Sequence, residues 1–287
     1  MAFFRPFTTL AVATLFASAA LGQPLIVDSF ESGDMSATNE DGFDWGANNR
    51  TSVVTADAAV YNNKTIENPI GSDQNWNPKD GEHSLRFRYP AGQPMAEQRF
   101  NLGKHYRDVW VTYWIRVPFN FTQGSLNSKF LALWPSTYDR PGTVTWQTRP
   151  NGNGGANLVY QDGGVTGGEI GSAAFISVPD DRGRWMQVAA HVKASSGPSA
   201  NDGIIQLFRR WEGADSFTKI HEKLTADTWD DSSSQQGLSQ GYIMGWANDP
   251  YDQDTEWLLD EFAVYTESPI DNVFISERPN PPTLTLR

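Results

Sequence analysis

Hydrophobic and polar side chains alternate along residues 185–193, which read Trp-Met-Gln-Val-Ala-Ala-His-Val-Lys. Such a period of two is typical of a β-strand with one buried face, which here would hold Met186, Val188, Ala190 and Val192. The other face carries an aromatic ring, an amide, an imidazole and an ammonium group, from Trp185, Gln187, His191 and Lys193. These groups suit a sheet that presents a shallow groove to a sugar chain.

Similar runs of aromatic and β-branched residues recur along the chain, separated by Gly, Pro, Asn and Asp. We predict strands at 84–89, 97–102, 109–117, 129–134, 143–149, 156–161, 185–193, 203–211, 241–246 and 256–265. Short strands at this spacing predict an all-β sandwich or barrel. Only residues 216–226 have a spacing that suggests a helical turn. We expect one domain over residues 23–267 and a proline-rich tail over 268–287.

The first 22 residues are typical of a secretory signal peptide. Arg5 provides the positive charge, and residues 10–21 form an apolar run that is too short to span a bilayer. Ala20 and Gly22 occupy the −3 and −1 positions of a cleavage site. No later run is apolar enough for a membrane helix. We therefore expect a secreted protein, extracellular or periplasmic, with no membrane partner.

Charge and cysteine content exclude several classes of function. The chain has 22 basic and 34 acidic residues, which argues against a nucleic-acid partner. It has no cysteine, so disulfide scaffolds and thiolate metal sites are excluded. Acidic residues gather in the predicted loops, whereas bases such as Arg99, Lys129 and Arg149 fall inside predicted strands. An acidic protein can therefore still carry a local basic face.

Four segments together resemble a known superfamily. They are Phe30-Glu31-Ser32-Gly33-Asp34, Trp110 to Pro118, Asn201 to Phe208, and Leu258 to Tyr265. Over residues 25–266 the chain is similar to the concanavalin A-like jelly rolls, and especially to secreted polysaccharide lyases of the heparinase, alginate-lyase and glucuronan-lyase type. The resemblance implies a jelly-roll β-sandwich of two antiparallel sheets. The superfamily also holds hydrolases and lectins, so it does not settle the activity.

Two departures from the superfamily's patterns bear on the chemistry. The Glu-x-Asp-x-Glu strand of retaining glucanases is missing, which argues against a glycosidase with close paired carboxylates. The Gln-x-His pair that many jelly-roll lyases carry on a groove strand falls here at Ala132 and Trp134. Other strands would therefore have to provide the carboxylate neutraliser and the base.

The resemblance implies β-elimination on an acidic, uronate-containing polysaccharide. This reaction needs a group that neutralises the C6 carboxylate, a base for the C5 proton and an acid for the leaving oxygen. We expect His191 or Tyr160 as the base, with Tyr138 as a further phenol. Arg149, Gln147 or Lys193 would neutralise the carboxylate. Surface or loop-anchoring roles stay open for His191, Lys193 and Tyr138, and no cofactor is needed for catalysis.

Tryptophans and bases could bind the sugar chain itself, because aromatic rings pack well against the C–H faces of sugars. The groove candidates are Trp134, Trp185, Gln187, Arg99 and Lys129. A structural calcium ion is implied by the related folds, in which it ties the first and last strands. Its ligands would be Glu31, the carbonyl of Gly33 and Asp260, and an acidic turn without an ion is the alternative.

Two functions remain open from the sequence, with a hydrolase that uses unfamiliar carboxylates as a third alternative. The first is a secreted polysaccharide lyase, expected to be a monomer, that cleaves an acidic polysaccharide. The second is a non-catalytic, lectin-like carbohydrate-binding module, favoured by the missing Gln-x-His pair and the many tryptophans. A convergence of His191, Arg149 and a tyrosine hydroxyl on one spot would favour the lyase, and a face made only of aromatic and amide groups would favour the module.

Overall fold

The computed structural model describes residues 22–56, 58–61, 64–67, 76–164, 167–231 and 233–270. The signal-peptide prediction lies outside these ranges except for Gly22, and so does the tail beyond Ile270. Regular structure in the described ranges is entirely β-strand. Accordingly, the described part of the chain contains no helix with the length and apolar character needed to cross a membrane.

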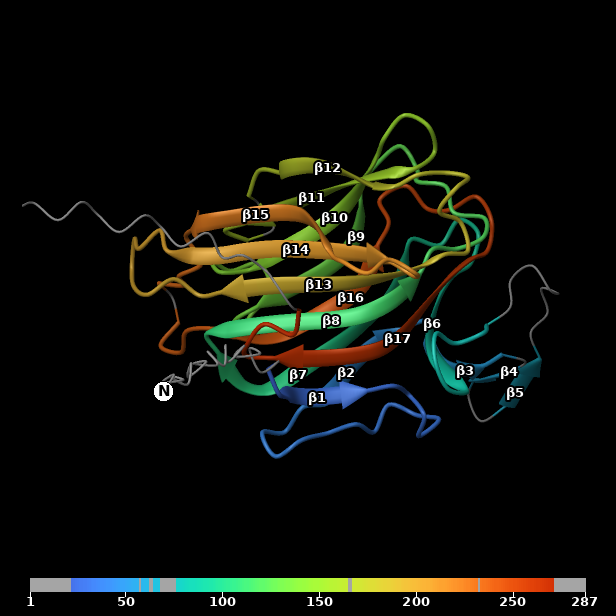
Figure 1. Ribbon diagram of the computed structural model, residues 1–287, viewed down its shortest axis with the longest axis horizontal. Coiled ribbons are helices and arrows are strands. Elements are labelled where there is room, and N and C mark those ends of the chain that lie inside the picture. The colour runs from blue at the N-terminus through green and yellow to red at the C-terminus, as the bar shows by residue number, and fades with distance from the viewer. Residues whose placement is uncertain are drawn as a thin grey trace, which may run out of the picture.

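The strands form two antiparallel sheets that lie one behind the other (Figure 1). The front layer is a ten-stranded sheet, called sheet A, with β15-β14-β13-β8-β17-β6-β3-β4-β5 as its order and β1 paired to β17. Its strands are β1 (Pro24–Asp28), β3 (Thr51–Thr55), β4 (Ala58–Tyr61), β5 (Lys64–Glu67), β6 (His83–Tyr89), β8 (Asp108–Arg116), β13 (Trp185–Lys193), β14 (Gly203–Trp211), β15 (Thr218–Ala226) and β17 (Thr255–Tyr265).

The rear layer is a seven-stranded sheet, called sheet B, in the order β12-β11-β10-β9-β16-β7-β2. Its strands are β2 (Asp44–Asn49), β7 (Met95–Tyr106), β9 (Ser128–Trp134), β10 (Val144–Pro150), β11 (Ala156–Asp162), β12 (Ile170–Ile176) and β16 (Leu238–Trp246). The all-β jelly-roll sandwich predicted from the sequence is confirmed by these two sheets.

One hydrophobic core fills the space between the sheets. The alternation in 185–193 behaves as predicted, since Met186, Val188, Ala190 and Val192 all lie in this core. The neighbouring strand β8 contributes Val111, Tyr113 and Ile115 from its inner face. Strands β8 and β13 therefore each place one face in the core, and their alternate side chains lie on the outer face of sheet A.

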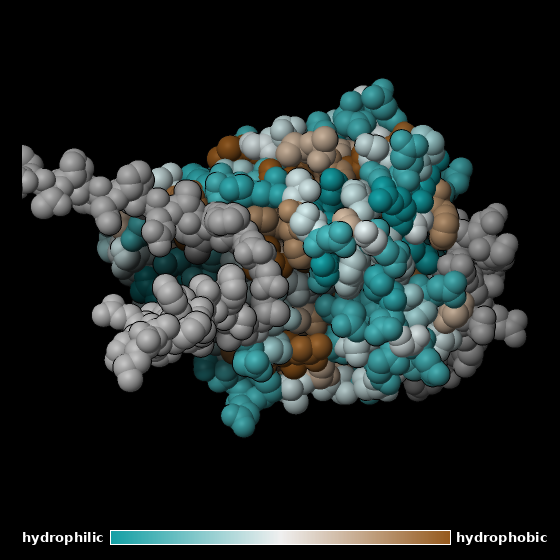
Figure 2. All heavy atoms as spheres, viewed as in Figure 1, coloured by the Kyte–Doolittle hydropathy of each residue, from teal (hydrophilic) through white to brown (hydrophobic). Residues whose placement is uncertain are grey.

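The outer face of sheet A is shown in Figure 2, where hydrophilic residues predominate over the right half and hydrophobic residues are scattered. A sugar chain could reach either outer face, so the predicted site residues must lie together on one of them to form a single site.

The helical turn expected at 216–226 is wrong, because β15 occupies Thr218–Ala226 and pairs with β14. The strand lies at the edge of sheet A, so much of it is exposed and its sequence is polar. Ile220 and Leu224 are four residues apart, which imitates a helical spacing. Edge pairing to β14 overrides this local pattern.

Candidate active site

A row of side chains crosses the outer face of sheet B at the level of Tyr242. In the strand register, Tyr242 of β16 lies opposite Arg99 of β7 on one side and Ala132 of β9 on the other. The residues flanking them along the strands, such as Phe100 and Ile243, lie in the core. Because side chains alternate between faces, Arg99, Ala132 and Tyr242 point away from the core.

Two phenols and an ammonium group meet on this face. The Nζ of Lys129 donates to the hydroxyl oxygen of Tyr138 at 2.9 Å, and the hydroxyl oxygens of Tyr138 and Tyr242 are 3.3 Å apart. The Nζ also lies 4.8 Å from the ring centroid of Tyr138 and 5.5 Å from that of Tyr242. We call Arg99, Lys129, Trp134, Tyr138 and Tyr242 the Lys129 cluster.

Trp134 forms the floor of the Lys129 cluster and is not an exposed platform. Only 2% of its surface is exposed, and the ring of Tyr138 packs edge-on against it with centroids 5.3 Å apart. Its Nε1 donates to Oε1 of Gln240 at 2.9 Å. The guanidinium of Arg99 lies 5.8 Å from the centroid of Trp134. Trp134 therefore supports the groups that a ligand could reach.

The charge of the site is a net positive one. The Nε of Arg99 donates to Oε1 of the largely buried Glu97 at 2.7 Å, so these two charges offset each other, and Lys129 is left as the surplus cation. Burial raises the pKa of Tyr242 well above its ordinary value, with the neighbouring Tyr138 adding to the shift. Tyr242 therefore stays neutral and keeps its hydroxyl proton near Tyr138.

Gln147 and Arg149 lie on β10, next to β9, but are both engaged with neighbours. Gln147 lies opposite Lys129 in the register and is hydrogen-bonded to Asn127 and Gln161. The Nε of Arg149 donates to both carboxylate oxygens of Glu169, at 3.0 and 2.8 Å. The structure thus brings Gln147 beside the Lys129 cluster, whereas Arg149 has its charge already paired.

His191 lies on the opposite side of the molecule, on the outer face of sheet A. Its Nε2 is 2.8 Å from Oδ1 of Asp108 and its Nδ1 is 2.9 Å from Oε1 of Gln206. Its ring stacks on Trp110, with centroids 4.1 Å apart and planes 6° apart. Only 4% of the residue is exposed. The convergence of His191 with Arg149 and Tyr138 is therefore not found.

The other residues that we predicted from 185–193 share this second face. Oε1 of Gln187 accepts from Nε of Arg210 at 2.6 Å. Trp185 is buried and packs in a small cluster with Trp76, so it is not an open sugar platform as expected. Lys193 is exposed at the end of β13. A second outer face thus holds four of the predicted residues and none of the Lys129 cluster.

Tyr160 belongs to neither outer face. It lies in the core between the sheets, opposite Trp146 in the register of β10 and β11, with its ring 5.1 Å from that of His221. The expectation of a groove-facing base at this position is thus corrected. Residues 156–161 form a strand as predicted, but the period of two alone does not tell which of its faces is buried.

The expected calcium ligands are engaged by backbone N–H groups. The carboxylate of Glu31 accepts from the amides of Glu82 and His83, and that of Asp260 accepts from Lys79, Asp80 and Glu261. Within the described ranges, no group of three or more His, Asp or Glu side chains could hold a metal ion. Amide groups thus already use oxygens of Glu31 and Asp260, and the calcium ion expected at Glu31, the Gly33 carbonyl and Asp260 stays a prediction.

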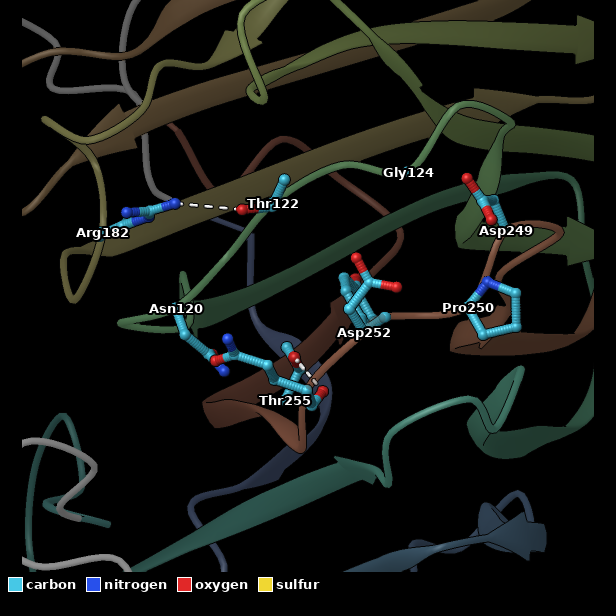
Figure 3. Close-up of a pocket in the computed structure, with 10 residues that line it drawn as sticks. Asn120, Thr122, Gly124, Arg182, Asp249, Pro250, Asp252 and Thr255 are labelled. Carbon is cyan, nitrogen blue, oxygen red and sulfur yellow. Dashed lines mark hydrogen bonds between the residues drawn. The ribbon is translucent and has the colours of Figure 1, made fainter.

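A polar hollow of about 300 Å³ lies among the loops at one end of the sandwich (Figure 3). Arg182 donates from Nη2 to Oγ1 of Thr122 at 3.1 Å, as Figure 3 shows. Asn120 donates from Nδ2 to the carbonyl of Asp254 at 2.9 Å. Asp249 accepts from the amide and hydroxyl of Ser125. These bonds tie loops together, so the hollow is held by its own side chains.

Arg99, Lys129, Trp134 and Tyr138 were each predicted as site residues, and the structure brings the four together. It missed Tyr242, Glu97 and Gln240, which complete the site. Tyr242 falls inside the predicted strand 241–246, so its outward direction could have been read from the apolar Ile243 beside it. Its contacts with Arg99 and Tyr138 could not be predicted from the sequence, because they depend on which strands and loops lie side by side.

No protein-family model matches this sequence, and no curated protein matches it. Solved structures do. An alginate lyase of family PL-14 from Aplysia kurodai aligns with a TM-score of 0.51 at 12% identity, over 66% of this chain and 84% of that one. An alginate lyase from a Chlorella virus aligns with a TM-score of 0.43 at 10% identity, over 79% and 95%.

A further structural neighbour is botulinum neurotoxin type C, whose cell entry depends on two ganglioside molecules. It aligns with a TM-score of 0.46 at 11% identity, over 86% of this chain and 48% of that one. At such identities the likeness is one of fold. The chain therefore has a two-sheet jelly-roll sandwich fold, similar to that of the Aplysia kurodai alginate lyase.

Proposed function

We propose that this protein is a secreted polysaccharide lyase that cleaves an acidic polysaccharide by β-elimination at the Lys129 cluster. The observation that carries the proposal is the contact of the Lys129 ammonium with the Tyr138 hydroxyl, 2.9 Å apart, on an outer face that also holds Arg99. The lyase-like fold agrees with this chemistry. The secreted location rests on the sequence of residues 1–22 alone.

In this mechanism Arg99 faces the C6 carboxylate of a uronate unit, which acidifies the C5 proton. Tyr138, as the phenolate, takes that proton, while the ammonium of Lys129 stabilises the negative charge on the phenol oxygen. The C4–O bond breaks and a C4=C5 double bond forms. The Tyr138 hydroxyl then gives the proton to the departing oxygen, which restores the phenolate.

Tyr242 acts as a positioning residue in this scheme. Its hydroxyl oxygen is 3.3 Å from that of Tyr138, and it is buried under the site. A neutral hydroxyl at this place holds the reacting oxygen in one position, which is what efficient proton transfer needs. The side-chain surface of Arg99 is 43% exposed, so its guanidinium can still reach a carboxylate while it is paired with Glu97.

The proposal is tested by mixing the purified protein with glucuronan, alginate, heparin-like glycans and ulvan and following ultraviolet absorbance. We expect absorbance to rise with at least one polymer, because β-elimination leaves an unsaturated uronate end. Tyr138→Phe should lose at least 100-fold in rate, the lower range for a group that transfers protons. Tyr265→Phe, on the outer face of sheet A, is the matched control and should keep its rate.

Binding without cleavage would contradict the proposal. If one polymer binds and no unsaturated product forms, the lectin-like module becomes the better function. Normal activity of Tyr138→Phe would show that the reaction occurs elsewhere on the molecule.

A further inference from the structure

A hollow of about 560 Å³ lies beside the Lys129 cluster, at the end of sheet B where β7 and β16 meet the loops. Asn101 and Gln240, which lie directly opposite each other in the register, line it together with Ser136, Lys104, His105 and Gln235. Asn101 is two residues from Arg99, and Gln240 is two from Tyr242. Two residues along a strand span about 7 Å, so the hollow begins one step beyond the cluster.

The hollow presents two amide donors that no neighbour uses. Oδ1 of Asn101 accepts from the amide of Gly103 at 2.9 Å, and Oε1 of Gln240 accepts from Trp134 at 2.9 Å. These bonds fix both amide planes. In the described part of the chain, neither Nδ2 of Asn101 nor Nε2 of Gln240 has a hydrogen-bond acceptor. Each side chain is thus oriented by its oxygen and offers its nitrogen.

The hollow carries almost no net charge, unlike the Lys129 cluster beside it. The Nζ of Lys104 is 2.6 Å from Oδ1 of Asp41, which offsets its charge. Burial lowers the pKa of His105, so that its imidazole is uncharged at neutral pH. Neutral N–H donors recognise hydroxyl and carbonyl oxygens without needing an opposite charge.

We propose that the hollow at Asn101 and Gln240 is a separate subsite, in which the two amide groups donate to oxygen atoms of the sugar unit next to the one that reacts. This inference rests on the proposed function for the location of the reacting unit. It adds a claim of its own, namely that part of the affinity comes from uncharged donors on β7 and β16 and therefore survives high salt.

The test is the binding of alginate and glucuronan tetrasaccharides, measured by calorimetry on the full protein at low and at high salt. Asn101→Asp and Gln240→Glu are the informative variants, since each keeps the oxygen acceptor that fixes its side chain and replaces the donor by an oxygen. Asn153→Asp, in an exposed loop, adds the same charge away from the hollow and is the control. Thermal unfolding checks that each variant folds.

We expect each informative variant to bind the tetrasaccharide at least about tenfold more weakly than the wild type, at both salt concentrations, and Asn153→Asp to bind normally. At 1 M salt the Debye length is about 3 Å, so repulsion between charges that are further apart is largely screened. A defect that disappears at high salt would therefore overturn the subsite, because it would come from added charge alone. Unchanged binding, or no binding by the wild type, would overturn it as well.

Cleavage of the polymers is followed in parallel, so that failure of the two proposals can be told apart. A wild type that binds without forming unsaturated product refutes the lyase, whereas a defect of Asn101→Asp in the same binding experiment still supports the subsite. A wild type that cleaves, with variants that bind normally, refutes the subsite alone.

Discussion

At the scale of single residues, His191 shows how a chemically suitable side chain can serve the fold. Gln206 donates from Nε2 to Glu222 at 2.8 Å, so its Oε1 accepts from Nδ1 of His191. Oδ1 of Asp108 lies 2.8 Å from Nε2, the other ring nitrogen. Both ring nitrogens thus face acceptors, and the ring is covered by Trp110. A group held in this way has no free nitrogen to take a substrate proton.

We therefore expect His191→Ala to lower stability and to leave catalysis per folded molecule unchanged. The substitution removes a buried ring and leaves the Gln206 oxygen without its donor, which should cost about 1–3 kcal/mol in the free energy of unfolding. Urea unfolding gives that loss, and the initial rate normalised to folded protein gives the activity. A rate that falls at least 100-fold at unchanged stability would restore His191 as the base.

Tyr242→Phe tests the positioning role of a buried hydroxyl. The phenyl ring is kept, so the packing against Trp134 should remain. Loss of the hydroxyl 3.3 Å from Tyr138 should lower the rate by about tenfold or less, since one neutral hydrogen bond contributes on the order of 1 kcal/mol. The maximal rate should fall more than the Michaelis constant rises. A rate equal to that of the wild type would exclude the role.

At the scale of the strand, an irregularity in β16 leaves room for Lys129. Met244 and Gly245 have φ angles of +59° and +147°, and both end the regular alternation of this strand. A Cβ atom built on Gly245 would lie 3.2 Å from Oε2 of Glu97 and 3.2 Å from Cβ of Lys129. The missing side chain therefore leaves room for these two residues of the site.

Gly245→Val should disturb the site by displacing Lys129 and Glu97. We expect at least a tenfold loss of rate, together with a loss of about 1–3 kcal/mol in stability from the unfavourable backbone angle. Gly152→Val is the matched control. Its φ is +87°, but a Cβ there meets nothing within 4 Å, so it should lose stability and keep its rate. Equal rates for the two variants would show that the contact with Lys129 is unimportant.

Strands were predictable where aromatic and β-branched residues run together, as in β8, β13 and β17. All ten predicted strands are present, and β14 has the predicted bounds of 203–211. Among the strands that were missed, β2, β12 and β15 lie at sheet edges, where exposure weakens the alternation. The members of the Lys129 cluster come from β7, β9, β16 and the loop after β9. These strands are neighbours because of the strand order in sheet B, which no local sequence pattern encodes.

At the scale of the whole molecule, the junction of the first and last strands is a cluster of buried carboxyl groups. Burial raises the pKa of Asp28 and Glu261 above their ordinary values, and raises that of Asp260 to about 7. For Asp260 this outweighs three backbone N–H groups, which lower the pKa. The junction therefore binds protons more tightly when the protein is folded.

Calcium should have little effect at this junction. The Glu31 and Asp260 oxygens already accept from amides of residues 79–83 and from Glu261. We expect the same thermal midpoint in excess calcium as in excess chelator. A midpoint that rises with calcium in the wild type, and does not rise in Asp260→Ala, would establish the ion instead.

Stability should fall as the pH rises from about 4 to about 7. A carboxyl group whose folded pKa is above its unfolded value contributes stability that is fully present below the unfolded pKa and is lost as the pH passes the folded pKa. For Asp260 the unfolded pKa is 3.8 and the folded pKa is about 7. Each pKa unit corresponds to about 1.4 kcal/mol, so the free energy of unfolding should fall by a few kcal/mol. Urea unfolding of the wild type across this range measures the slope.

Asp260→Ala should flatten that slope even though it is less stable at every pH, because it leaves the amides of Lys79 and Asp80 without an acceptor. Asp254→Ala is the control. The amide of Ala91 lowers the pKa of Asp254, so this residue contributes stability above its unfolded pKa, and its removal should leave the slope between pH 5 and 7 as in the wild type. A wild type whose stability rises over this range would show that Asp260 is ionised in the folded protein.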